Sequence, residues 1–481
     1  MTQKARPIQA TYLYVLSLII CLCCAVSCKK HNENNDVNLR FSCENNTLTF
    51  DTVFTSVGSI TKHFTVHNPS KSDVTTTIYL AGGAKSKYSI NVNGMPGIHF
   101  KDVTIPAKDS IFIFVKVNID PNNPDNHFLE TDSIVFMTGV RTQDVNLMAY
   151  GQDANFILAD PKSGFKVVAG ENETVTWTKE KPYVVYGWAA IDSTGTLNIE
   201  AGTKIYFHSG SGLWAYRYSN LNVNGTLEEP VSFRGDRLEA WFNDDYAQWD
   251  RIWINEGAEV SIHYAVISNA FVGVQIEPLP TNDGFLNITD KTIKIENSII
   301  QKTKNCGVIS RFLNVNMTNC VIADNGGYGL LLEGGKFTMK HLTVANYYMQ
   351  AERKNPTCFI SNKVLSIKEY ETLDPIETKA EFINCIITGR NETEVEVKKM
   401  DGAELTAAFK NCLVKSKNDA DFFEACLLNK DPLFTDKDKH DFTLLPDSPV
   451  IGKGKPDVGV PFDILGNPRG NAPDIGAYQV K

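Results

Sequence analysis

The chain has 481 residues, of which 42% are hydrophobic and 21% are charged, with 47 Lys and Arg against 56 Asp and Glu. It is too long for one ordinary domain, and its composition fits neither general disorder nor a protein that crosses a membrane many times. The net charge of −9 argues against a nucleic-acid partner, because phosphates are recognised by basic surfaces.

An apolar segment near the start of the chain predicts export. Lys4 and Arg6 precede an apolar run over residues 12–26. As a helix this run would rise about 22 Å, short of the roughly 30 Å hydrocarbon core of a bilayer. It is therefore typical of a signal peptide rather than of a membrane span, and we place the signal at residues 1–27.

The signal ends in Ala25-Val26-Ser27-Cys28, which resembles a bacterial lipobox, where a lipidated Cys becomes the mature N-terminus. The polar residues 28–36 would form a tether. No Asp follows Cys28, so the resemblance implies the outer membrane, with the chain lipid-anchored and facing the cell surface. Loss of the signal leaves 45 cations and 56 acids, a net charge of −11, so the lipid itself would be the anchor. An ordinary signal peptide is the alternative.

Cysteine usage predicts neither a disulfide framework nor a metal site. Of the 11 Cys, three leave with the signal and Cys28 is the expected anchor. The others form no CxxC pair, and their number is odd, so we expect no zinc and no cofactor. These seven are Cys43, Cys306, Cys320, Cys358, Cys385, Cys412 and Cys426.

Residues 37–154 show short runs rich in β-branched and aromatic side chains, separated by turn residues. This spacing, without helical periodicity, predicts an antiparallel β-sandwich. The runs "FDTVFTSVGSITKHFTVHNPS" and "IPAKDSIFIFVKV" resemble the immunoglobulin-like modules of bacterial surface proteins. Such a module either binds a ligand or acts as a spacer, and we favour the spacer. The runs are Leu48-Thr49-Phe50, Ile60 to Val66, Thr75 to Leu80, Ile111 to Val117 and Ser133 to Met137.

Residues 155–481 repeat. The segment pattern is apolar-x-Asn-small-apolar-apolar, with 22 residues from Asn297 to Asn319 and 21 from Asn319 to Lys340. The later spacings, 44 residues from Lys340 to Asn384 and 27 from Asn384 to Asn411, suit either two coils or one coil with an insertion. A period near 22 is the signature of a parallel β-solenoid. The repeats are Ile295–Ile300, Met317–Ile322, Met339–Val344, Phe382–Ile387 and Phe409–Val414.

The repeat assigns structural roles to otherwise unusual residues. The Asn at each repeat would stack as an amide ladder at a bend, and the Cys one position later would be a small buried hydrophobe. Gly202 and Gly225 lie where an earlier coil must turn sharply. The ladder residues are Asn297, Asn319, Asn384 and Asn411, and the thiols are Cys320, Cys385 and Cys412.

"WDRIWI" followed by "VSIHYAVISNAFVGVQI" resembles the right-handed parallel β-helix, pectin-lyase-like, of bacterial surface proteins. The tail from Ser448-Pro449 through Arg469 to Asp474-Ile475-Gly476-Ala477 is similar to the C-terminal end of exported β-helix proteins. That resemblance implies a cap that closes the last coil, because an open solenoid end is an unpaired sheet edge. We expect Arg469 to form a capping ion pair with Asp474 or Asp463.

Catalytic motifs are weak. Asp244-Asp245 resembles the Asp pair of polygalacturonases, but that family's Asn-Thr-Asp, Gly-His-Gly and Arg-x-Lys motifs are missing from this sequence. A lyase would use Arg251 as base with calcium held by nearby acids. The acids of 436–441 alternate as in a calcium loop, but they lack its Gly and its final Glu, so we expect a solvated turn.

All six Trp lie between positions 177 and 253. Trp rings can stack on sugar rings while neighbouring acids and amides bind the hydroxyls, so Trp241, Tyr246 and Trp249 in the loop 236–250 are candidate glycan contacts. The alternative is that these rings pack in the first coils. Trp253 alternates with Ile252 and Ile254, which indicates packing or an outward ring.

These patterns predict an all-β, lipid-anchored surface protein with a β-sandwich stalk and a right-handed parallel β-helix. We expect non-catalytic polysaccharide binding through ring stacking and hydrogen bonds. A polysaccharide lyase or glycoside hydrolase is the main rival, with Asp244, Asp245 and Arg251 as its candidates. An adhesin or structural surface protein is the third possibility.

Overall fold

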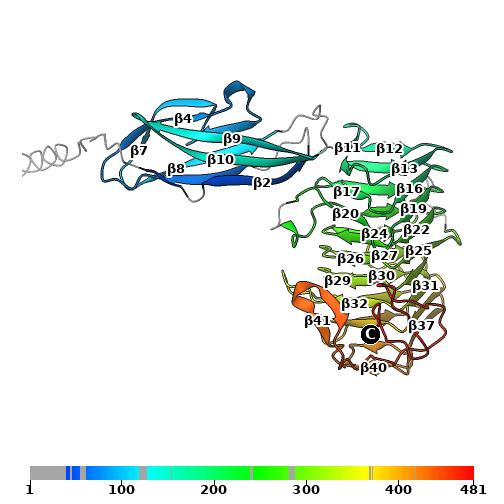
Figure 1. Ribbon diagram of the computed structural model, residues 1–481. Helices are drawn as coiled ribbons and strands as arrows, with labels where there is room; N and C mark the ends of the chain where they lie inside the picture. The colour runs from blue at the N-terminus through cyan, green and yellow to red at the C-terminus, as the bar shows by residue number, and fades with distance from the viewer. Residues whose placement is uncertain are drawn as a thin grey trace, which may run out of the picture. The chain divides into compact units, whose positions relative to one another are not determined.

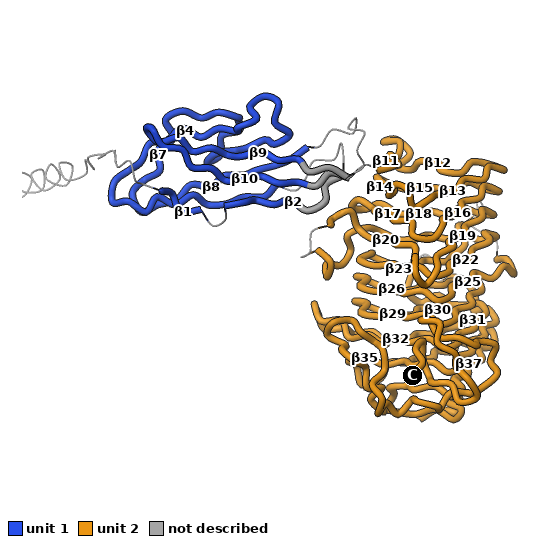
Figure 2. The backbone as a smooth tube through the Cα atoms, viewed as in Figure 1, with its two compact units in different colours: residues 1–153 blue, residues 154–481 orange. Residues whose placement is uncertain are grey.

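The computed structural model describes residues 40–43, 46–54, 61–118, 127–152, 154–238, 242–280, 288–367, 370, 372–417 and 419–480. The chain divides into two compact units, Met1–Asp153 and Ala154–Lys481 (Figure 2). The expected signal peptide, Cys28 and the tether lie outside the described residues. Among those that are described, no helix is long and apolar enough to cross a bilayer.

The first unit is a β-sandwich of two five-stranded sheets. Strands alternate between buried and exposed side chains, as in β8, where Ile111, Ile113, Val115 and Val117 face the core. One sheet has the order β1 (Ser42–Cys43), β3 (Lys62–His67), β8 (Ser110–Val117), β5 (Tyr88–Val92) and β6 (Met95–Gly97). The other has the order β2 (Thr47–Phe54), β10 (Arg141–Gln152), β9 (His127–Thr138), β4 (Val74–Leu80) and β7 (His99–Ile105).

The second unit is a right-handed parallel β-helix built from three long parallel sheets (Figure 1). Sheet 1 contains β11 (Asn155–Leu158), β14 (Tyr183–Tyr186), β17 (Lys204–Phe207), β20 (Val231–Gly235), β23 (Ala265–Ser268), β26 (Ile299–Gln301), β29 (Val321–Ala323), β32 (Thr343–Asn346), β35 (Ile386–Gly389), β38 (Leu413–Val414) and β40 (Leu427–Leu428). Sheet 2 contains β12 (Phe165–Ala169), β15 (Trp188–Ile191), β18 (Gly212–Ala215), β21 (Ile252–Ile254), β24 (Val272–Ile276), β27 (Cys306–Arg311), β30 (Tyr328–Glu333), β33 (Cys358–Ser361) and β36 (Val395–Lys398).

Sheet 3 completes each coil. It contains β13 (Thr174–Trp177), β16 (Thr196–Glu200), β19 (Asn220–Asn224), β22 (Glu259–His263), β25 (Thr292–Glu296), β28 (Asn314–Thr318), β31 (Gly335–Lys340), β34 (Thr378–Ile383), β37 (Leu405–Lys410) and β39 (Phe423–Glu424). A coil takes one strand from each sheet in turn, and each strand pairs with its counterpart in the next coil. The prediction of an all-β chain with a sandwich followed by a parallel β-helix is confirmed. The sandwich is not wholly antiparallel as predicted, because β2 pairs with β10 in parallel.

The solenoid interior is a continuous apolar stack. Cys320, Cys385 and Cys412 are fully buried among it, as expected for small apolar side chains. Phe382 and Phe409 occupy the same position in neighbouring coils, with ring centroids 4.6 Å apart and planes 12° from parallel. Equivalent positions therefore pack on one another from coil to coil, which is how a solenoid buries its core.

The turn from sheet 3 to sheet 1 explains the repeated Asn. Asn297, Asn319, Asn384 and Asn411 all have φ between 49° and 56°, a left-handed conformation that Asn tolerates better than most residues. Asn319 Nδ2 donates to Asn297 Oδ1 over 3.1 Å, so part of the ladder bonds directly. Lys340 was wrongly placed in this register, because Lys340 pairs with Thr318 and Ile383 in the strands.

His341 occupies the ladder position instead, with φ 52°. Its Nε2 lies 3.0 Å from Nδ2 of Asn384. The pairing of β31 directly with β34 also decides the long spacing between these residues. His341 and Asn384 are one coil apart, and that coil carries insertions.

The tail lies along the side of the solenoid. Tail backbone groups bond to Asn319, Thr343, Asn384 and Asn411, which belong to four successive coils. The hairpin β41 (Phe434–Asp436) and β42 (Asp441–Leu444), which flank a 3-10 helix η4 (Lys437–Lys439), packs with the tail on the outer face of sheet 1. In these contacts the tail covers the ladder side rather than closing the last coil.

The expected capping ion pair is wrong. Arg469 donates to the backbone oxygens of Asp474 and Gly476 and to Oδ1 of Asn319, at 3.3, 2.9 and 2.9 Å. The carboxylate of Asp463 instead accepts hydrogen bonds from backbone N–H groups at 465, 467 and 479, and that of Asp474 accepts from those at 452 and 480. The tail's own turns need these acceptors, which leaves the guanidinium with carbonyl partners.

Candidate functional site

The long insertions of the solenoid all flank sheet 2. Ranges 236–250 and 347–357 connect sheet 1 to sheet 2, and ranges 277–291 and 362–377 connect sheet 2 to sheet 3. Connections from sheet 3 to sheet 1 are short throughout the described coils. In solenoids, insertions on one side mark the binding face. The insertions therefore indicate that the outer face of sheet 2 is a candidate binding surface.

Each insertion is fixed to the coils, either by its own ion pair or by hydrogen bonds to an ion pair of the coils. Charged side chains of the coils bind residues of the insertions, so the insertions beside sheet 2 keep a defined position. Leu279 N also bonds to Glu256, and Leu365 N bonds to Glu333, both within 2.9 Å. The pairs Asp244–Lys302 and Arg353–Glu394 join an insertion to a coil. The pairs Arg217–Glu256 and Arg311–Glu333 lie within the coils and bind the insertions by hydrogen bonds.

The first coils of the same outer face carry a cluster that we name the aromatic strip, formed by Trp188, Trp214 and Trp253 together with Phe165 and Tyr216. Trp214 and Trp253 are in register on neighbouring strands, with ring centroids 5.2 Å apart and planes 15° from parallel. The Trp188 and Trp253 rings are 6.0 Å apart at 58°. All five rings are half-buried, so each keeps a surface for a ligand.

The alternation of the strands places these rings outside. Leu213 and Ala215 flank Trp214 and are fully buried, so Trp214 must face outward. Gly212 makes room for Trp188, because a Cβ added there would lie 2.5 Å from Cζ3 of that ring. The Trp188 ring therefore lies over the backbone of the next coil.

Polar side chains follow the strip along the same face. The Arg251 guanidinium bonds to Asp250, with Nε 2.8 Å from Oδ1, and also to Gln275. Gln275 contacts Glu277, whose Oε2 lies 2.7 Å from Nη1 of Arg311. The Arg251 and Asp250 side chains are about a fifth to a quarter exposed, so they can offer donors and an acceptor next to the rings.

The carboxylates beyond Gln275 fit an anchoring role. Glu277 and Glu333 both bond to Arg311, and they are 6% and 0% exposed. A glycosidic bond lying on the surface would not reach two carboxylates that are covered and share one guanidinium. The strip with its polar border can therefore stack sugar rings and bond hydroxyls, while these acids hold the face together.

The candidate catalytic residues predicted from the sequence do not lie together in one site. Asp244 Oδ1 lies 2.6 Å from Lys302 Nζ, and this hydrogen bond lowers the pKa of the Asp244 carboxyl. His440 lies between two acids, with Nδ1 2.5 Å from Oδ2 of Asp324 and Nε2 3.7 Å from Oδ1 of Asp244. Asp245 is exposed beside Asp244, whereas Arg251 belongs to the polar border of sheet 2.

The candidate glycan contacts have three outcomes. Trp249 is 1% exposed, stacks on Phe207 at 4.4 Å and donates to Ser268 O, so it is a packing residue and its predicted glycan contact is wrong. Tyr246 is half-buried and meets Tyr348 edge to face at 4.9 Å, and burial raises the pKa of its hydroxyl. Trp241 lies outside the described residues.

The sequence reasoning missed Trp188 and Trp214 as site residues. A signal was available, because the Leu213-Trp214-Ala215 alternation matches Ile252-Trp253-Ile254. The insertion 236–250 separates the two in sequence and hides their register. In the sequence, the aromatic residues within the insertion gave the stronger signal for a glycan site than the strands on either side of it.

No metal site emerges from the described part of the chain, where no group of three or more His, Cys, Asp or Glu has a suitable arrangement. Asp436, in the segment with calcium-like alternation, accepts a hydrogen bond from Lys439 N and caps η4. That contact is local turn geometry.

Comparison with known proteins supports no conclusion about this chain. No family model and no curated protein matches the chain. A family 123 glycoside hydrolase from Clostridium perfringens, studied for glycolipid glycan hydrolysis, is similar over 26% of this chain and 31% of its own, with 8% identity and a TM-score of 0.19. The CooA pilin subunit of enterotoxigenic Escherichia coli is similar over 23% and 90%, with 10% identity and a TM-score of 0.17. The chain thus spans about a third of the hydrolase's length, and such TM-scores carry no functional argument.

Proposed function

We propose that this protein binds polysaccharide, without cleaving it, along the aromatic strip of sheet 2. The observation that carries the proposal is the set of half-buried Trp rings on one rigid outer face, bordered by Arg251 and Asp250 and flanked by anchored insertions. A contiguous group of partly exposed rings is typical of a binding surface. Sugar rings offer apolar C–H faces that match them.

The mechanism would be stacking on a preformed platform. The Trp188 ring lies over Gly212 in the next coil of the β-helix, so little side-chain entropy is lost when a sugar covers it. Coils repeat about every 4.8 Å along the solenoid, which is close to the length of one sugar residue, so a chain lying along the axis could meet successive strands. Arg251 and Asp250 would bond hydroxyls at the edge of the platform.

The test is affinity electrophoresis and calorimetry of the full-length chain with neutral and acidic polysaccharides. Trp188→Ala should weaken binding about ten-fold, which corresponds to about 1.4 kcal/mol and to the loss of one stacked ring. Phe112→Ala is the matched control, because Phe112 is an exposed ring of the sandwich, 47% exposed. Equal binding by Trp188→Ala and the wild type would contradict the proposal.

The location that we propose is the outer membrane, with the lipid of Cys28 as anchor and the strip presented at the cell surface. The lipobox-like Ala25-Val26-Ser27-Cys28 supports this, and the sandwich would serve as a spacer. Labelling cells with radioactive palmitate and repeating it with Cys28→Ala tests the anchor. Incorporation that survives the substitution would refute it.

Cleavage is a second candidate because of one observation. Asp324 is 2% exposed and holds Nδ1 of His440, as an orienting acid holds a general base, with Lys302 and Asp244 on the other side. Release of reducing ends or unsaturated products from a polysaccharide, lost in both His440→Ala and Asp244→Ala, would replace binding by catalysis. No turnover in the wild type would leave binding as the function.

A further inference from the structure

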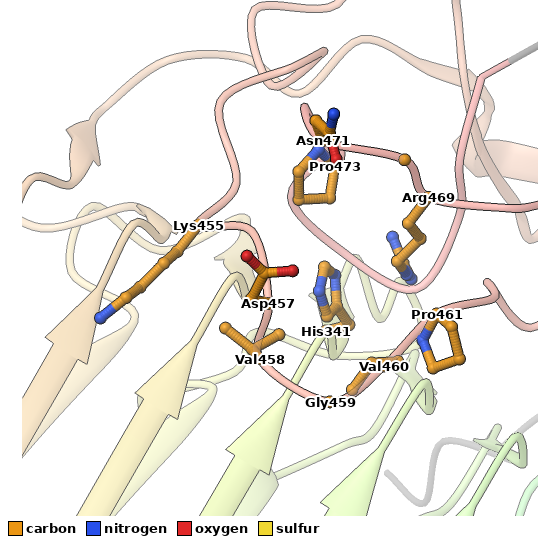
Figure 3. A pocket seen from close by; sticks show the side chains of 11 residues that line it. His341, Lys455, Asp457, Val458, Gly459, Val460, Pro461, Arg469, Asn471 and Pro473 are labelled. Carbon is orange, nitrogen blue, oxygen red and sulfur yellow. The ribbon is translucent and has the colours of Figure 1, made fainter.

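A cavity of about 560 Å³ lies away from the strip, between the ladder turn at His341 and two segments of the tail (Figure 3). Its size is within the roughly 300–1,000 Å³ usual for small-molecule sites. One tail segment, 455–461, and the other, 469–473, form its walls. The described cavity therefore exists because the tail lies along the side of the solenoid.

Arg469 brings an unused donor to this cavity. It is 4% exposed, and three of its five N–H bonds go to Asp474 O, Gly476 O and Asn319 Oδ1. Among the described residues its Nε has no hydrogen-bond partner. Nε is itself covered by protein atoms, so the donor left for a ligand is the second N–H of Nη1, and an unpaired buried N–H is costly.

Asp457 faces the same space with an acceptor. Figure 3 shows its carboxylate directed toward His341, whereas the Lys455 side chain extends away from the group. Asp457 has φ 56°, a left-handed conformation. No hydrogen bond to its carboxylate exists within the described part of the chain, so the group is available.

His341 is fully buried and contributes no charge to the cavity. Its Nδ1 lies 3.3 Å from Gly476 O and its Nε2 bonds to Asn384, so neither nitrogen is free. Burial, with the Arg469 charge second, lowers the pKa of the imidazole to about 3, which keeps it neutral. Pro461, Pro473 and the valines at 458 and 460 add apolar walls.

This combination selects the chemistry of the ligand. An anion would meet Asp457, and the charge of Arg469 already interacts with those of Asp463 and Asp474 outside the cavity. A cation would meet the guanidinium. A hydroxyl both donates and accepts, so vicinal hydroxyls on an apolar ring suit one acceptor, one donor and apolar walls together.

We propose that this pocket binds one neutral sugar residue, with Asp457 accepting from its hydroxyls and Arg469 donating to them. The site is separate from the aromatic strip and does not depend on it. A chain end or a free monosaccharide would enter, since the pocket has room for a short saccharide only.

The test uses the full-length chain in detergent micelles, with saturation-transfer NMR and titration of D-glucose, D-galactose and D-mannose, and with D-galacturonate and inorganic phosphate as anionic arms. At least one neutral hexose should bind with a Kd on the order of 1 mM. Asp457→Ala and the pocket-filling Val460→Trp should each weaken binding at least ten-fold. Asp447→Ala is the matched control, because Asp447 is an exposed acid of the same tail outside the pocket.

Three results would overturn the proposal: no neutral hexose binds, phosphate or galacturonate binds more tightly than every neutral hexose, or Asp457→Ala binds as the wild type does. Trp188→Ala reports on the strip through binding of the polysaccharide, and Asp457→Ala reports on the pocket through binding of the free hexose. Failure at the strip and failure at the pocket are therefore distinguished by which of the two variants alters which ligand.

Discussion

Replacing His341 by Asn should remove a pH dependence from the solenoid. His341 is fully buried and neutral, and its folded pKa of about 3 is far below the ordinary 6.5. A depressed folded pKa means that stability is complete above pH 6.5 and is lost as the pH falls toward 3, because only the unfolded chain gains the proton. His341→Asn keeps the left-handed turn and the amide ladder of the neighbouring coils, without a titrating group.

The magnitude follows from the two pKa values. Between pH 6.5 and pH 4 the wild type should lose about 3 kcal/mol of unfolding free energy relative to the variant, at up to about 1.4 kcal/mol per pH unit. Carboxylates titrate equally in both proteins, so they cancel in the difference. Guanidinium unfolding followed by Trp fluorescence reports the solenoid alone, since all six Trp lie in the second unit. A wild-type-minus-variant difference that stays constant across this range would refute the argument.

Two further predictions concern the buried side chains. Glu394→Ala should cost about 3–5 kcal/mol, because it leaves Arg353 buried without its partner, and the double replacement Arg353→Met with Glu394→Leu should recover most of the loss in the same unfolding assay. Maleimide at pH 8 should label Cys426 first among the seven cysteines beyond Cys28, because it is half-buried and the hydrogen bond to Cys412 lowers the pKa of its thiol. Burial raises the pKa of the half-buried Cys43 to about 11 and that of the buried Cys320 to about 12, so the five buried thiols should stay unlabelled. Mass spectrometry that found a buried thiol modified in the native protein would contradict this.

The inside of the solenoid could be predicted because its side chains follow simple local rules. Asn recurs where the chain needs a left-handed residue, and a small thiol follows where the next side chain enters the core. Both requirements act within a few residues. The register error at Lys340 arose where His replaces Asn, since a search for identical residues passes over a substitute that satisfies the same backbone conformation.

Long-range contacts could not be predicted in this way. The partner of Arg469 is Asn319, far back in the sequence, whereas the acids near Arg469 in sequence satisfy backbone N–H groups of their own turns. Proximity in sequence favoured the ion pair. In the structure these acids accept from backbone N–H groups instead, because an unpaired buried N–H is itself costly.

The three turns of the coil separate the tasks of the solenoid. The turn from sheet 3 to sheet 1 is short, repeats Asn and is covered by the tail, so insertions there would collide with it. The two turns beside sheet 2 carry every long insertion of the described coils. Two insertions are fixed by their own ion pairs, and the other two by hydrogen bonds to ion pairs of the coils. Interruptions of the 22-residue period are therefore informative in themselves. They mark the outer face of sheet 2, and Trp188, Trp214 and Trp253 lie on that face.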